Sequence, residues 1–186
     1  MAPFFTRGGD DGYTGVLGEG RVPKNDAIME ALGALDEANA CLGVARPACR
    51  DAGTREIVAR TQRHLYALMA EVAATPENAA RFRTIEESHV LWLEEQTEAI
   101  HQKAPAPKDF ILPGDTPAGA ALDLARAVVR RAERRVVELS HNGWVQNQAL
   151  MRYLNRLSSL IFVLEIYENM LGGFDQSTLA KDAGAE

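Results

Sequence analysis

The sequence of 186 residues has few cysteines and aromatic residues and no long apolar run. Its two cysteines, Cys41 and Cys49, are too few for a disulfide scaffold and lie outside any spacing typical of a zinc site. No apolar stretch approaches the roughly 20 residues that cross a membrane, and the N-terminus lacks the apolar core of a signal peptide. We therefore expect a cytoplasmic protein with reduced thiols and no membrane partner.

An excess of positive charge is also missing. The chain has 20 Lys and Arg against 26 Asp and Glu, which gives a formal net charge of −6. This balance argues against nucleic-acid binding, which favours a basic domain. With 46% hydrophobic and 25% charged residues, the composition predicts one soluble globular domain. We find no internal repeat and no second domain in the sequence.

Positive charge is nevertheless concentrated in one predicted helix, which includes residues 123–138. Apolar residues recur on one of its faces at helical spacing, and arginines line the adjacent face. The five arginines are Arg126, Arg130, Arg131, Arg134 and Arg135. Like charges this close repel one another. They are either solvated or paired in salt bridges, or they bind phosphate, whose oxygens guanidinium contacts in a planar, bidentate manner.

The N-terminal residues 1–25 hold six of the fifteen glycines and show no sustained periodicity, which predicts a long loop. Within it, residues 6–14 mix glycines with hydroxyl groups and one cation, a composition that suits wrapping around a polyphosphate. The sequence has no Walker A motif. This segment is therefore either a frayed tail or a phosphate-binding loop.

Helical periodicity without a convincing strand pattern predicts an all-α, single-domain, five-helix bundle. Thr84 and Glu87 are expected to form a capping box at the start of the third helix. No repeated pattern of carboxylates and histidines indicates a metal site on the protein's own side chains. The expected helices cover residues 26–46, 54–74, 84–102, 117–139 and 145–171, so that the bundle occupies 26–173, preceded by the 1–25 loop and followed by a mobile tail, 174–186.

Two polar residues within expected helices and one apolar stretch in a connection depart from this pattern. Asp36 lies at the margin of the first apolar stripe, and it forms either an internal hydrogen bond or a salt bridge to an arginine of the central helix. Asn155 places a polar group in the middle of the last helix. Residues 110–113 are consecutive apolar residues in a proline-rich connection. They either cap the core or line a cavity for a large apolar ligand.

In order and spacing, six segments resemble the PduO-type ATP:cob(I)alamin adenosyltransferases over about residues 4–173. The resemblance implies a ferritin-like or cobalamin adenosyltransferase-like bundle that assembles as a homotrimer, with ATP and corrinoid bound between subunits. It also implies that cob(I)alamin attacks the 5′ carbon of ATP, giving adenosylcobalamin and triphosphate. The segments are FTRGGDDGYTG, RVPKND, ALGALDEAN, FILPGD, RAVVRRAERRVVEL and YLNRLSSLIFVL.

The resemblance implies roles for particular residues. Asp36 and Arg126 match an intersubunit salt bridge that shapes the corrinoid site, and Phe110 matches the aromatic that displaces the lower axial ligand of cobalamin. Mg²⁺ is expected to be held mainly by the ATP phosphates. The implied ATP contacts, of which Arg130, Glu133 and Arg134 are the expected catalytic residues, are Thr6, Arg7, Gly8, Gly9, Thr14, Lys24, Arg130, Arg131, Glu133, Arg134 and Asn155.

The sequence departs from the family pattern at three positions. Gly8 and Asp11 stand where the family usually has threonine and lysine, and Asp115 stands where a second glycine is common. The loss of a cation at position 11 is expected to weaken ATP binding. An alternative function is a cobalamin carrier that delivers adenosylcobalamin under the control of ATP. The further partners implied are an adenosylcobalamin-dependent enzyme and a cobalamin reductase.

Overall fold

The fold is seen in a computed structural model that describes residues 5, 7–105 and 107–181. Six helices and one hairpin form in these ranges, and none of the helices is long and apolar enough to cross a membrane. The strands are β1 (Tyr13–Gly15) and β2 (Arg21–Pro23). The helices are α1 (Ala27–Ala48), α2 (Ala52–Ala73), α3 (Ala79–Phe82), α4 (Glu87–His101), α5 (Pro117–His141) and α6 (Gln148–Leu171).

The predicted single-domain, mostly helical fold is confirmed, but the number of elements differs. The additional helix, α3, has only four residues and lies in the connection between α2 and α4. The N-terminal loop contains an antiparallel hairpin, in which Thr14 pairs with Val22. Neither was expected, because elements of three or four residues are too short to show a periodic apolar pattern.

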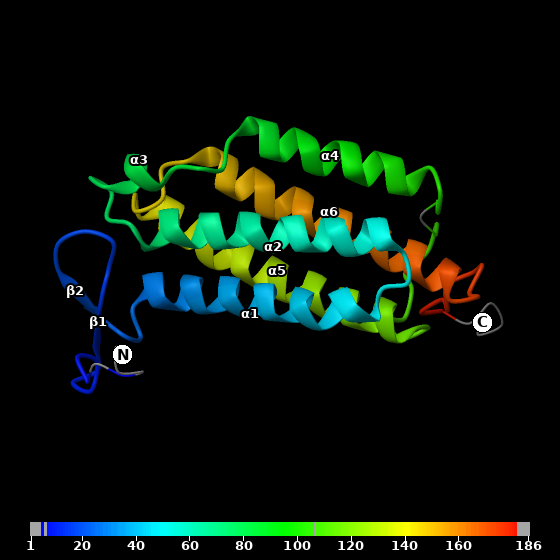
Figure 1. The fold of residues 1–186 in the computed structure, drawn as a ribbon, viewed down its shortest axis with the longest axis horizontal. Helices are drawn as coiled ribbons and strands as arrows, with labels where there is room; N and C mark the ends of the chain where they lie inside the picture. Colours follow the sequence, from blue (N-terminus) through cyan, green and yellow to red (C-terminus); the bar gives the residue numbers. More distant parts are fainter. Residues whose placement is uncertain (1–4, 6, 106, 182–186) are drawn as a thin grey trace.

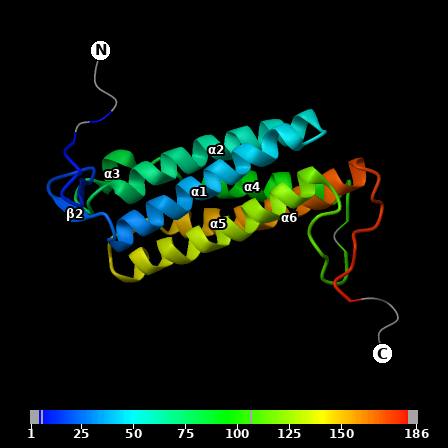
Figure 2. The same ribbon diagram turned by 90° about the horizontal axis from the view of Figure 1, so that it is seen from below.

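The long helix α5 lies at the centre of the packing. It packs against α1 on one side and α6 on the other, while α2 covers α1 and α4 covers α6 (Figures 1 and 2). The apolar stripe expected for the arginine helix is buried as predicted, and this burial fixes which side α5 turns outward. The buried residues of that stripe are Ala125, Val128, Val129, Ala132, Val136 and Leu139.

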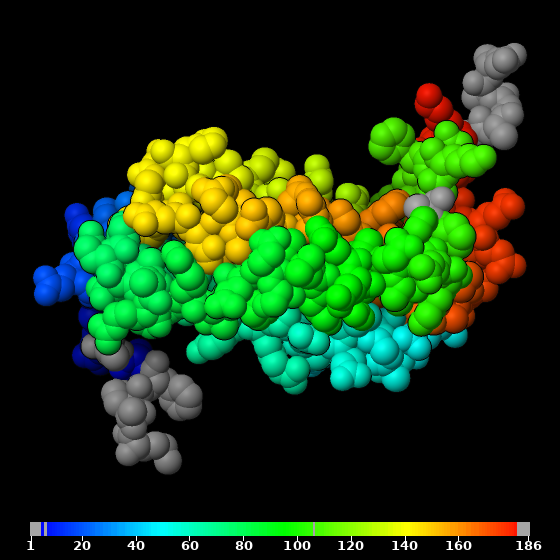
Figure 3. Space-filling model, turned by 90° about the horizontal axis from the view of Figure 1, so that it is seen from above, coloured from blue at the N-terminus to red at the C-terminus, as the bar shows by residue number. Residues whose placement is uncertain are grey.

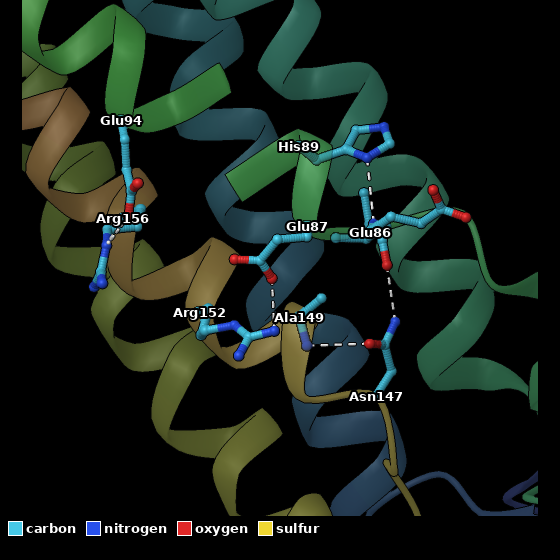
Figure 4. Close-up of polar contacts among 9 residues, drawn as sticks. Glu86, Glu87, His89, Glu94, Asn147, Ala149, Arg152 and Arg156 are labelled. Atoms are coloured by element: carbon cyan, nitrogen blue, oxygen red, sulfur yellow. Dashed lines mark hydrogen bonds and ion pairs between the residues drawn. The ribbon is translucent and has the colours of Figure 1, made fainter. Parts of the chain in front are cut away.

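The start of α4 differs from the sequence prediction. Its N-cap is Glu86, whose backbone N–H donates to Nδ1 of His89 at 3.3 Å (Figure 4). Thr84 does not cap the helix, because its hydroxyl donates to a carbonyl two residues earlier. The Ile85 carbonyl accepts a hydrogen bond from Asn147, the N-cap of α6, at 2.9 Å. The beginnings of α4 and α6 are therefore joined.

Two ion pairs connect α4 to α6 farther along (Figure 4). Arg152 contacts Glu87 at 2.6 Å, and Arg156 contacts Glu94 at 2.8 Å. All four side chains are exposed, so each pair contributes at most about 1 kcal/mol. The buried apolar side chains, rather than these pairs, hold α4 in place.

Candidate functional site

One face of α5 lines a small, basic cavity together with α6. The cavity measures about 290 Å³ and is bordered by Arg130, Glu133, Arg134, Val137 and Asn155. Asn155 Nδ2 donates to Glu133 Oε1 at 3.0 Å, which holds that carboxylate in place. Within the described ranges, the guanidinium of Arg130 has no side-chain partner. An exposed, unpaired arginine beside a cavity suits the binding of an anion.

The remaining arginines on this part of α5 turn toward α1. Arg131 forms an ion pair with Glu37 of α1. Arg135 lies 3.8 Å from Glu30 of α1 and 3.4 Å from Glu138 of its own helix. The salt-bridge alternative therefore applies to Arg131 and Arg135, and phosphate binding by Arg130 stays a prediction. Arg131 does not line the small cavity, and its role in binding ATP stays a prediction.

A larger cavity of about 860 Å³ lies between the 108–113 connection, α5 and α6. Phe110 and Ile111 line it from the connection, as expected if the apolar run serves a ligand rather than the core. Phe110 is 89% exposed. Because burying an aromatic ring away from water lowers the free energy, Phe110 is suited to pack against an apolar ligand.

Arg126 and Asp123 form part of the same cavity wall. The Arg126 guanidinium donates to Asp123 Oδ1 at 2.6 and 2.9 Å and lies 5.9 Å from the centre of the Phe162 ring. The predicted partner of Arg126, Asp36, is exposed on α1 and has no partner among the residues described. Pairing of Arg126 with Asp36 of another subunit therefore stays a prediction.

The two cavities are lined by successive turns of α5. Arg126 lines the large cavity and Arg130 lines the small one, and they are four residues apart on one helix. At 1.5 Å per residue this separation is about 6 Å along the helix axis. A ligand that reaches from one cavity to the other would thus span only one helical turn. The arrangement places a small arginine-lined cavity beside a large cavity whose walls combine apolar and charged residues.

The predicted N-terminal site residues that the structure describes lie in and around the hairpin and not at the two cavities. The hairpin is at the end of the bundle where α1 begins, opposite the C-terminal segment (Figure 1). Within the hairpin region, Gly9 lies against Lys24, since a Cβ atom at Gly9 would be 2.9 Å from Lys24 Nζ. None of Arg7, Gly8, Gly9, Thr14 and Lys24 lines either cavity, and Thr6 lies outside the described residues.

Asp11, which replaces the family's usual lysine, has a structural partner in this hairpin. Its two carboxylate oxygens accept hydrogen bonds from Arg21 at 2.7 and 2.8 Å. Arg21 also donates to the carbonyls of Gly8 and Tyr13. The hydrogen bond from Arg21 lowers the pKa of Asp11 to about 2, so the pair stays charged at neutral pH. Asp11 and Arg21 therefore stabilise the folded-back shape of the loop.

Asp115, another departure from the family pattern, binds the C-terminal segment. Its carboxylate accepts hydrogen bonds from the Thr178 backbone N–H at 3.0 Å and hydroxyl at 2.6 Å. Two backbone bonds of 2.8 Å add to this contact, from Leu112 to Thr178 and from Ala180 to Phe110. The segment therefore lies beside the Phe110 connection, at the wall of the large cavity (Figures 2 and 3). The mobility of residues 174–186 stays a prediction.

We expect Asp115→Ala to detach this segment. The substitution removes both side-chain hydrogen bonds to Thr178, so amide exchange at Leu112 and Ala180 should accelerate about tenfold, corresponding to one or two lost hydrogen bonds. Hydrogen–deuterium exchange followed by mass spectrometry measures this change. Asp109→Ala, on the same connection, is the control and should leave exchange unaltered. Unchanged exchange in Asp115→Ala would show that the backbone bonds alone hold the segment.

Sequence reasoning missed three residues near the large cavity. Asp123 and Phe162 line it, but each has an ordinary position in a helical pattern and gave no distinct signal. Glu165 does have a recognisable sequence signal, because it is an acidic residue within the apolar run 160–167 of α6. A charged residue at such a position demands an explanation.

The fold and the two cavities define a helical-bundle protein with a small arginine-lined cavity and a larger cavity on the same side of α5. A family model described as cobalamin adenosyltransferase matches residues 4–168. The chain belongs to the cobalamin adenosyltransferase family. The resemblance found from the motifs is therefore confirmed.

Individual relatives agree with this assignment. The corrinoid adenosyltransferase PduO of Citrobacter freundii is 38% identical over 161 residues, covering 86% of this chain but only 48% of that protein. This chain thus spans about half the length of that relative. A corrinoid adenosyltransferase of Mycobacterium bovis is 38% identical over 176 residues, covering 91% of this chain and 90% of the relative.

Solved structures also match. A variant of the PduO-type ATP:corrinoid adenosyltransferase from Lactobacillus reuteri, complexed with cobalamin and ATP, superposes with a TM-score of 0.88 at 32% identity. The match covers 97% of this chain and all of that chain. A second variant of the same enzyme, complexed with ATP, gives a TM-score of 0.84 at 30% identity.

Proposed function

We propose that this chain transfers the 5′-deoxyadenosyl group of ATP to cob(I)alamin, forming adenosylcobalamin and releasing triphosphate. The observation that carries the proposal is the position of the small Arg130 cavity one helical turn from the large Arg126 cavity. The names of the relatives and the cobalamin and ATP bound to a structural neighbour support this choice of ligands.

In the proposed reaction, the Co(I) electron pair forms the bond to C5′ of ATP. The bond between C5′ and its oxygen breaks, and that electron pair leaves with the triphosphate. Because Co(I) is itself a strong nucleophile, the protein needs only to align the two substrates and to stabilise the departing charge. Arg130 and Arg134 supply that charge stabilisation, and Asn155 holds Glu133 beside them.

We further propose that the complete site lies between subunits of a homotrimer. None of the described residues of the N-terminal loop lines either cavity, so a neighbouring chain's loop would close the ATP site. In the same way, Asp36 of one subunit would reach Arg126 of the next. The proposed bundle, 26–173, has five helices of 15 or more residues, with α3 as part of a connection. The loop 1–25 would contribute Thr6, Arg7, Gly8, Gly9, Thr14 and Lys24.

The corrinoid is proposed to bind in the large cavity. There the exposed ring of Phe110 would displace the lower axial ligand of cobalamin. Mg²⁺ would enter bound to the ATP phosphates, because it prefers oxygen ligands and keeps several waters. Among the residues the structure describes, no cluster of three His, Cys, Asp or Glu side chains could hold a metal. The two free thiols suit the proposed cytoplasmic location.

An anaerobic absorbance assay tests this function. The chain is mixed with chemically reduced cobalamin, Mg²⁺ and ATP, and adenosylcobalamin and triphosphate are quantified together. We expect equal amounts of both products over many turnovers, and none when ATP is omitted. Binding of both substrates without turnover would contradict the transferase and favour the carrier, which would release adenosylcobalamin only to a partner enzyme or on addition of ATP.

A further inference from the structure

Glu165 of α6 carries a buried carboxyl group that has no hydrogen-bond partner among the described residues. Glu165 is 1% exposed, and neither of its carboxyl oxygens accepts a hydrogen bond within the described part of the chain. Glu168, equally buried on the same helix, accepts hydrogen bonds from the backbone N–H groups of Arg50 and Asp51. Since burying an unpaired charge is costly, Glu165 requires a different explanation from its neighbour.

The packing of α5 on α6 shows what Glu165 faces. The two helices are antiparallel, and their contacts recur every seven residues on each helix. Glu165 follows Phe162 by three residues, and Asp123 precedes Arg126 by three. Glu165 therefore lies opposite Asp123, directly behind the wall of the large cavity. The recurring contact pairs are Gly119 with Asn169, Arg126 with Phe162, and Glu133 with Asn155.

The charged groups around Glu165 determine its protonation. Burial and the negative charge of Asp123, with a smaller contribution from Asp115, together raise its pKa to about 7, against the opposing charge of Arg126. Within the described ranges, no charged group of α1, α2 or α4 acts on it. Two carboxyl groups thus face one guanidinium, which Asp123 already binds at 2.6 Å. When Glu165 is protonated it is neutral and does not compete with Asp123 for the Arg126 guanidinium.

We propose that Glu165 is a positioning residue whose proton keeps the Asp123–Arg126 pair on the wall of the large cavity. This inference rests on the proposed function, which identifies the ligand of that cavity as a corrinoid. When Glu165 loses its proton, a second carboxylate competes for Arg126 and draws the guanidinium toward the α5–α6 interface. Corrinoid affinity therefore falls as the pH rises through neutrality. ATP binding at Arg130, in the other cavity, does not follow this change.

The test is a titration with cob(II)alamin under anaerobic conditions at pH about 6 and about 8.5, either side of the Glu165 pKa. For the unmodified chain we expect the dissociation constant to rise about tenfold with pH, as when one hydrogen bond to a charged group is lost. Glu165→Gln, which cannot ionise, should bind equally at both pH values. Glu95→Gln, an exposed position on α4, makes the same charge change and should behave like the unmodified chain. An unchanged pH dependence in Glu165→Gln would overturn the proposal.

Urea unfolding between pH 4.5 and about 7 provides a second readout that needs no corrinoid. The folded pKa of Glu165 lies above its ordinary value of 4.5, so stability is lost as the pH rises from there toward about 7. Glu165→Gln should lose less stability over this interval, and equal losses would overturn the protonation of Glu165. If no variant binds cob(II)alamin at any pH, the proposed function and the role of Glu165 in corrinoid binding both fail, while unfolding still reports the buried proton.

Discussion

Arg130→Ala should lower the rate of adenosyl transfer by about 100- to 1,000-fold, the usual loss when one donor to a developing negative charge is removed. Its guanidinium lines the small cavity and is not used by any other described side chain, so the bundle should remain folded. Single-turnover kinetics with cob(I)alamin and ATP measure the loss. A thermal melt followed by circular dichroism measures folding on the same sample.

Two further variants define what Arg130 contributes. Arg63→Ala removes an exposed arginine of α2 that lines neither cavity, and it should retain full activity. Arg130→Lys keeps the charge but loses the planar fork, so its rate should lie between those of the unmodified chain and Arg130→Ala. Near-normal turnover in Arg130→Ala would remove Arg130 from the proposed site, whereas a matching loss in Arg63→Ala would indicate a nonspecific charge effect.

Gly119→Ala should destabilise the fold by about 1–3 kcal/mol, the usual cost of overpacking a filled core. Gly119 lies in the first turn of α5, where a Cβ atom would be 2.7 Å from Cγ of Asn169. Asn169 cannot move aside easily, because it is 1% exposed and accepts a hydrogen bond from Thr116 at 2.7 Å. The midpoint of urea unfolding measures the effect.

Gly33→Ala is the matched control for Gly119→Ala. Gly33 is an exposed position of α1, and a Cβ atom there would meet no atom within 4 Å. Because alanine favours a helix over glycine, this variant should be about 0.5–1 kcal/mol more stable. If both variants were stabilised, the contact between α5 and α6 at Gly119 would be looser than described.

The sequence predicted the arginine helix well but could not tell its arginines apart. Periodicity placed the arginines beside a buried apolar stripe, which the structure confirms. Arg130 has no side-chain partner among the described residues, whereas Arg131 pairs with Glu37 of α1, and this contrast depends on how two distant helices meet. Helical spacing carries no information about such partners.

Local elements were missed for related reasons. The hairpin depends on Arg21, which closes the loop through Asp11 ten positions earlier, and a glycine-rich segment has no alternation to reveal it. Asp115 was noted only as a departure from the family pattern, since its partner Thr178 is 63 residues away. Glu165 was visible as an acid within an apolar run, but its position opposite Asp123 required the register of α5 on α6.

A crystal structure with ATP and cobalamin bound would test most directly whether the two cavities form one reaction site. We predict the triphosphate against Arg130 and Arg134, the corrin in the cavity beside Phe110 and Arg126, and C5′ of the nucleotide directed toward cobalt. A nucleotide bound away from Arg130, or a corrinoid bound outside the large cavity, would contradict the proposed site.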